Sequence, residues 1–170
     1  MMPDLTHALE KVLRAYDRYY DVDRLPSSPL FDARASFQLH DEQYVLVRSA
    51  KISEADSREQ VFFAIREELT QSVYEELDTA AWEEGLSCVD PGPNHRNTDI
   101  ILIILTNHLS EEAGKTIRKR RRYKSYRLGL RGWSDFHVIA YELSSGMMVT
   151  NRQGRMLEKT LRNIFPQTGS

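Results

Sequence analysis

Six consecutive apolar residues, Ile100 to Leu105, constrain the fold more than any other part of the chain. Successive side chains of an extended strand point to opposite faces of a sheet, so this run is apolar on both faces. Such a strand is stable in the middle of a sheet that is covered on both sides. The sequence therefore predicts a layered domain built around this strand. The run is also far shorter than the roughly 20 apolar residues that a membrane-spanning helix needs.

Apolar residues at three- and four-residue spacing predict the helices. This spacing occurs over 5–20, 57–84 and 157–165. Ser110, followed by two glutamates in the first turn, predicts the start of a fourth helix because serine caps helix N-termini and the helix dipole favours anions there. Four helices are therefore expected.

Alternating apolar and polar residues predict the other strands. The segments are 31–39 paired with 44–52 as an antiparallel hairpin, and 136–143 paired with 147–150 as a second hairpin. The proline- and glycine-containing segment 89–98 is expected to be a loop. The predicted fold class is α+β, with a mixed, largely antiparallel sheet of about five strands sandwiched with four helices.

The chain has 170 residues, of which 41% are hydrophobic. This suits a single globular domain over residues 1–170 with a sizeable buried core. The single cysteine, Cys88, excludes an intramolecular disulfide and suits a reducing compartment. The N-terminus lacks the charged-then-apolar pattern of a signal peptide. We therefore expect a soluble, cytoplasmic protein that is not bound to membranes.

Positive charge is concentrated in one segment, residues 115–131, which holds nine of the 23 lysines and arginines and no acidic residue. The whole chain has a formal charge of −2, so the remainder is strongly acidic. Much of that negative charge lies in residues 54–84, which contain ten acidic residues and only two arginines. Several partners of the basic segment remain open: nucleic acid, a smaller anionic ligand, an acidic protein surface, the protein's own acidic segment and a second copy of the chain.

The basic segment supplies the candidate binding residues. Lys115, Arg118, Lys119 and Arg122 fall on one face of a helix. The apolar stripe opposite them breaks down at Arg120, so the helix either ends near residue 120 or projects from the core. Tyr123 and Tyr126 lie among the charges, where rings can stack on bases, and Arg131 follows them. These residues are the predicted anion- or partner-binding site: Lys115, Arg118, Lys119, Arg122, Tyr123, Tyr126 and Arg131. The alternative is a solvated helix face that pairs with the acidic segment, and we expect this pairing to be incomplete.

The sequence GLRGW over residues 129–133 predicts a structural turn. Gly129 or Gly132 is expected to adopt a positive φ, with Trp133 packed into the core beside it and Asp135 starting the next strand. A GXXG loop of the KH RNA-binding type is disfavoured because that module needs a helix directly after the loop.

Catalytic signals are weak, and we expect no catalytic residues, no metal ligands and no cofactor. The common nucleophile, phosphate-loop and zinc patterns do not occur. Asp135 and His137 lie on one face of a strand. There they either form a structural hydrogen bond or contact a shared ligand. A metal-dependent nuclease that uses Asp99 or Asp135 is the alternative enzyme, but none of the six lysines follows a carboxylate by two residues.

The segment from Ser110 to Leu143, together with VTNRQG over 149–154, resembles a family of small uncharacterised bacterial proteins, a domain of unknown function. The shared pattern is a Ser-Glu-Glu helix, a basic-aromatic run, GLRGW, an Asp-led strand and an Asn-Arg/Lys-x-Gly turn. His137 stands where the resemblance implies a basic residue. The resemblance implies one cytoplasmic domain and brings no activity. We therefore expect a non-catalytic binding or interaction protein whose contact surface is cationic.

Overall fold

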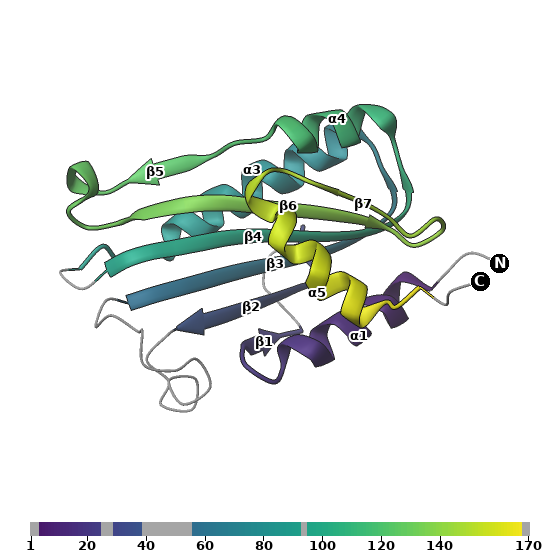
Figure 1. Cartoon of the computed structure of the whole chain (residues 1–170), viewed down its shortest axis with the longest axis horizontal. Coiled ribbons are helices and arrows are strands. Elements are labelled where there is room, and N and C mark those ends of the chain that lie inside the picture. Colours follow the sequence, from purple (N-terminus) through teal and green to yellow (C-terminus); the bar gives the residue numbers. More distant parts are fainter. Residues whose placement is uncertain (1–3, 25–28, 39–55, 93–94, 168–170) are drawn as a thin grey trace.

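The computed structural model describes residues 4–24, 29–38, 56–92 and 95–167. Within these residues, seven strands form one mixed sheet in the order β1-β2-β3-β4-β6-β5, with β7 beside β6 (Figure 1). The strands are β1 (Asp21–Asp23), β2 (Ala33–Gln38), β3 (Asp56–Leu69), β4 (His95–Leu109), β5 (Tyr123–Ser125), β6 (Trp133–Glu142) and β7 (Met147–Thr150). The helices are α1 (Leu5–Tyr16), α3 (Gln71–Ser87), α4 (Glu111–Lys119) and α5 (Met156–Ile164).

The centre of the sheet is parallel. β3 pairs with β4 and β4 with β6 in parallel, and α3 and α4 are the crossovers that parallel neighbours require. The outer pairings, β1 with β2, β2 with β3, β5 with β6 and β6 with β7, are antiparallel. The predicted α+β class, mixed sheet and four helices are confirmed, but the sheet is wider than the five strands expected and is partly parallel.

The helix predicted over 57–84 was wrong in its first half, which is strand β3. Val61, Ile65 and Leu69 are four residues apart, and that spacing also places side chains on one face of a strand. The four consecutive apolar residues from Val61 to Ala64 are all buried, as in a strand covered on both faces. Helix α3 starts only at Gln71, where the Thr70 side chain accepts a hydrogen bond from the Val73 N–H.

Two other expectations concern segment boundaries. The predicted strand over 44–52 lies outside the described residues, and within them β2 pairs with β3 and β1. The loop expected over 89–98 is shorter than predicted, since β4 already begins at His95. The second hairpin, β6 with β7, forms as predicted.

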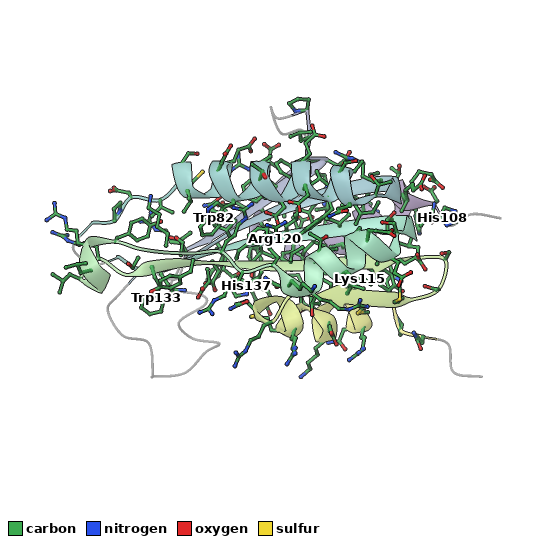
Figure 2. All side chains as sticks on the ribbon, turned by 90° about the horizontal axis from the view of Figure 1, so that it is seen from above. Trp82, His108, Lys115, Arg120, Trp133 and His137 are labelled. Carbon is green, nitrogen blue, oxygen red and sulfur yellow. The ribbon has the colours of Figure 1, made fainter. Side chains whose placement is uncertain are left out.

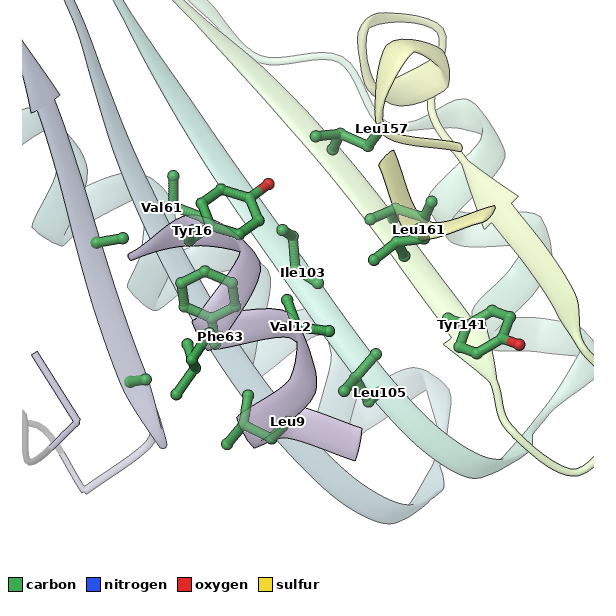
Figure 3. Packing of buried hydrophobic residues seen from close by; sticks show 14 of the residues in the cluster. Leu9, Val12, Tyr16, Val61, Phe63, Ile103, Leu105, Tyr141, Leu157 and Leu161 are labelled. Carbon is green, nitrogen blue, oxygen red and sulfur yellow. The ribbon is translucent and has the colours of Figure 1, made fainter. Parts of the chain in front are cut away.

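Helices cover both faces of the sheet, as the apolar run in β4 requires (Figure 1). Ile101, Ile103 and Leu105 pack on the side of α1 and α5, and Figure 3 shows this core with side chains of both helices over the sheet. The alternate residues of β4 pack on the side of α3 and α4. The predicted central strand is therefore confirmed.

The buried side chain of Asn151 ties three segments together. Its Oδ1 accepts hydrogen bonds from the N–H groups of Val138 (3.0 Å) and Gly154 (2.8 Å). Its Nδ2 donates to the carbonyls of Phe136 (2.9 Å) and Arg120 (3.2 Å). The amide thus continues the hydrogen bonding of β6 beyond the end of β7 and holds the residue that follows α4.

Asn151→Ala is expected to lower the free energy of unfolding by at least about 3 kcal/mol, because buried polar groups of β6 lose their partners. Asn163→Ala, at an exposed position of α5, is the matched control and should change it by less than about 0.5 kcal/mol. Urea unfolding of both variants measures the difference. Equal effects of the two substitutions would contradict the structural role of Asn151.

Candidate functional site

The structure divides the basic segment into cations that point inward and cations that stay exposed. Helix α4 ends at Lys119, and Arg120 and Arg122 then turn toward α3. Nε of Arg122 lies 2.6 Å from Asp78 Oδ1, and Nε of Arg120 lies 3.0 Å from Asp78 Oδ2. Arg120 also pairs with Glu75 at 2.5 Å. The expectation that Arg122 belongs to an exposed cationic helix face was wrong.

The reason is the burial of Asp78, whose side chain is fully enclosed between α3 and the basic segment. A carboxylate without water needs compensating charge and hydrogen bonds. Arg120 and Arg122 supply the charge, and the Tyr74 hydroxyl donates a further hydrogen bond at 2.5 Å. These two arginines therefore anchor the segment to the domain.

The exposed cations form what we call the cationic arm: Arg118 and Lys119 on α4, then Arg121, Lys124 and Arg127 around β5. Tyr123, 55% exposed, lies among them. Figure 1 shows β5 and the following turn along one edge of the sheet.

The other predicted binding residues are placed differently. Lys115 is exposed but pairs with Glu111, one helical turn away, at 3.3 Å. Tyr126 is half-buried, with its hydroxyl 2.9 Å from Ser134 Oγ and the Lys124 ammonium over its ring. Arg131 is half-buried at the end of the turn.

The GLRG segment forms the predicted turn, and both glycines adopt a positive φ, 89° at Gly129 and 82° at Gly132. Arg127 and Leu128 also have positive φ values, which are uncommon outside glycine. The carbonyl of Tyr126 accepts hydrogen bonds from the N–H groups of Gly129 and Arg131 and so holds this conformation.

Trp133, predicted to pack into the core beside the turn, is only half-buried. Figure 2 shows it near the end of the sheet, on the side that carries α5. Its indole lies close enough to Asp135 to oppose the rise that burial causes in the pKa of that carboxyl. Its neighbour Ser134, which points to the opposite face, is fully buried.

A second polar surface lies next to the arm, on the α1 and α5 face. Glu59 of β3, Asp99 of β4 and Asp135 of β6 are register partners, so they form one row across the sheet, which we call the carboxylate row. Tyr123 of the arm is the register partner of Asp135 and lies at the end of the row. Farther along the same strands, this face is apolar core.

His137 lies beside the carboxylate row and is 7% exposed. Its Nδ1 is 2.7 Å from the Gln153 carbonyl oxygen, which can only accept, so Nδ1 carries a proton. Its Nε2 is buried, makes no hydrogen bond within the described residues and lies 3.5 Å from Asp99 Oδ1. The Gln153 carbonyl at Nδ1 and the Asp99 carboxylate near Nε2 together favour the imidazolium form.

The surroundings change the pKa of two groups in this site. Burial lowers the pKa of His137, but the Asp99 carboxylate and the Gln153 carbonyl outweigh it, and the net pKa is raised. Burial raises the pKa of Asp135; His137 opposes this rise, Asp99 adds to it, and the net pKa is again raised. Perturbed pKa values of this kind are frequent at functional sites.

The sequence pattern places Asp135 and His137 on one strand face but does not show that Glu59 and Asp99 lie beside them. Glu59 was assigned to a helix, and the register between β4 and β6 is absent from the local pattern. The available signal was that polar residues replace the apolar alternation at the start of β3, β4 and β6. Among the described residues, no group of three or more histidine, cysteine, aspartate or glutamate side chains is arranged to hold a metal ion.

Asp78→Asn is expected to lower the free energy of unfolding by about 3 to 5 kcal/mol, since it leaves two partly buried guanidinium groups without their shared carboxylate. Glu83→Gln removes one charge from an exposed position of the same helix, and its effect should stay below about 0.5 kcal/mol. Chemical denaturation measures both. If Asp78→Asn is as stable as the control, Asp78 does not anchor the segment.

The raised pKa of His137 predicts how stability depends on pH. The stabilisation is fully present below the unfolded pKa of about 6.5 and is lost as pH rises through the folded pKa. His137→Gln should therefore flatten the decline in unfolding free energy above about pH 6.5. His108→Gln, at an exposed position, should leave the decline unchanged. Unfolding titrations at several pH values test this, and an unchanged profile in His137→Gln would refute it.

Comparison with known proteins gives a family but no activity. No curated protein and no solved structure is significantly similar to the chain. In the part of the chain that the structure describes, no helix is long and apolar enough to cross a membrane. The model of a domain of unknown function matches residues 4–163, which include the carboxylate row and the cationic arm. The chain therefore belongs to the family of the domain of unknown function DUF8052.

Proposed function

We propose that the protein is a non-catalytic binding protein that holds a nucleic acid strand along the cationic arm. The observation that carries the proposal is the division of the basic segment. Arg120 and Arg122 neutralise the buried Asp78, whereas Arg118, Lys119, Lys124 and Arg127 form no ion pair with the described residues. Structural pairing thus accounts for only part of the positive charge.

The spacing of the exposed cations favours a polymer over a small anion. Arg121, Lys124 and Arg127 follow a largely extended backbone that rises about 3.3 Å per residue, which spreads their backbone positions over roughly 20 Å, with Lys124 on the opposite face of the strand from Arg121. A small anion is held by donors that converge on it. Cations spread along a line instead suit a chain of phosphates, which supplies sequence-independent affinity.

Tyr123 adds a feature typical of single-strand binding. Tyr123 is 55% exposed and lies among the cations of the arm. Aromatic rings at such positions stack on bases and contribute about 1 to 3 kcal/mol per base. The combination favours a single-stranded nucleic acid over an acidic protein surface.

Titration of labelled single strands at several salt concentrations tests the proposal. Affinity should fall steeply with salt, because each neutralised phosphate contributes about 0.7 to the logarithmic slope. Arg118→Gln, Lys119→Gln and Arg127→Gln combined should flatten the slope by about 2 and leave the melting temperature nearly unchanged. The matched control combines Arg14→Gln, Arg18→Gln and Lys159→Gln, which removes the same charge from exposed positions of α1, the turn after it and α5.

A second pair of variants separates stacking from charge. Tyr123→Ala should weaken binding by about tenfold and leave the salt slope unchanged. Tyr19→Ala, at a side chain of similar exposure, should leave both the affinity and the salt slope unchanged. Absent or salt-insensitive binding by the parent protein would remove the proposal. An arm variant that alters oligomeric mass in light scattering but not nucleic acid retention would favour a protein interface.

The non-catalytic part of the proposal has its own check. Magnesium or manganese added to the same strands should yield no cleavage. Metal-dependent cleavage that Asp99→Ala abolishes would replace binding with a nuclease function.

A further inference from the structure

The carboxylate row lies where a polyanion bound on the arm would meet it. Tyr123 belongs to the arm and is also the register partner of Asp135. Arg121, two residues earlier, is close enough to Asp135 to oppose the rise that burial causes in that carboxyl's pKa. A strand that follows the arm therefore passes beside Asp135 and Asp99. These carboxylates repel phosphate, so a strand group that approaches them has to donate a hydrogen bond.

Structural contacts account for only part of the row: the Tyr20 hydroxyl donates a hydrogen bond to Glu59, whereas Asp99 and Asp135 form no ion pair with an arginine or lysine of the described residues. Elsewhere on this face, β3, β4 and β6 bury apolar side chains under α1 and α5. Partly buried carboxylates at register positions of three adjacent strands destabilise the fold by desolvation and mutual repulsion. His137, buried and with Nε2 lacking a hydrogen bond, is directed at Asp99 from the core side. The ion pair between Nε2 and Asp99 is thus made without a hydrogen bond, and a buried polar pair that is not fully satisfied beside such a row is typical of a site that serves a ligand.

The chemistry of the row selects a neutral donor. His137 already supplies positive charge to Asp99, and the Asn97 amide donates to Asp99 Oδ1 at 3.1 Å. The imidazolium disfavours a second cation at the same carboxylate, and the described residues contain no arrangement of three or more metal ligands. A hydroxyl group carries no charge and donates a hydrogen bond to a carboxylate. Within a nucleic acid strand, the sugar hydroxyl with these properties is the 2′-hydroxyl of ribose.

We propose that Asp99 and Asp135, with His137 orienting Asp99, form a site for the 2′-hydroxyl of a ribose whose phosphate contacts Arg121, so that the arm binds RNA in preference to DNA. This inference rests on the proposed function and gives it a substrate class. His137 is a positioning residue in this arrangement. The ligand contacts fall to the two aspartates and to Arg121.

The test compares labelled strands of one sequence as RNA, DNA and 2′-O-methyl RNA. RNA should bind about five- to tenfold more tightly than DNA for each hydroxyl contact. The 2′-O-methyl strand should bind no better than DNA, because the methyl group removes the donated hydrogen while the ribose remains. This comparison uses the parent protein and does not depend on the folding of any variant.

Two variants test whether the preference for RNA over DNA arises at the proposed ribose site. Asp135→Ala should bring the affinities for RNA and DNA together, mainly by weakening RNA, whereas Arg121→Gln should weaken both strands about equally. Asp21→Ala, which removes a carboxylate from an exposed position of β1, is the control and should leave the preference intact.

The outcomes separate this inference from the proposed function. Equal, salt-dependent binding of RNA and DNA would overturn the ribose site and leave nucleic acid binding standing. A 2′-O-methyl strand that binds as tightly as RNA would also overturn it, since strand shape would then be recognised. Binding of neither strand would overturn the proposed function and the ribose site together.

Discussion

The arrangement of this protein depends on the need to cover β4 on both faces. A strand with six consecutive buried apolar residues is stable only between two layers, and the chain supplies them with α1 and α5 on one side and α3 and α4 on the other. Two of these helices are crossovers, which makes the central strands parallel and brings the starts of β3, β4 and β6 to the same end of the sheet. The carboxylate row lies at that end because parallel neighbours align their first residues.

Two buried polar side chains then position the cationic arm and the carboxylate row. Asp78 draws Arg120 and Arg122 inward, and this fixes where the chain leaves α4 and enters β5. Asn151 donates hydrogen bonds to the carbonyls of Arg120 and of Phe136 in β6. It also accepts a hydrogen bond from Gly154, in the turn whose Gln153 carbonyl contacts His137. The arm and the row are thus supported by one continuous set of buried hydrogen bonds. Such networks specify one arrangement because each unsatisfied member is costly in a low-dielectric interior.

The sequence predicted the features that are encoded within a few neighbouring residues. It did not predict those that depend on pairing between distant segments. The apolar run in β4, the Ser110 cap and the glycines of the turn each indicate a structure within a few residues, and each was found. The assignment of β3 failed because a four-residue apolar spacing fits a helix and a strand equally. Arg122 was misplaced because only the fold shows that Asp78 is buried beside it, and the row was missed because register is set by contacts between distant segments.

The short strand β5 has a further consequence for how copies of the protein meet. It lies at the edge of the sheet, where an unpaired strand can template pairing with another chain. Three residues of strand, with Lys124 at their centre, Arg121 before them and a turn of positive φ after them, make a poor template. Two such edges brought together would set arginine and lysine side chains against each other. The arm therefore also protects the sheet from growing by addition of a second molecule, and this protection weakens wherever its charges are neutralised.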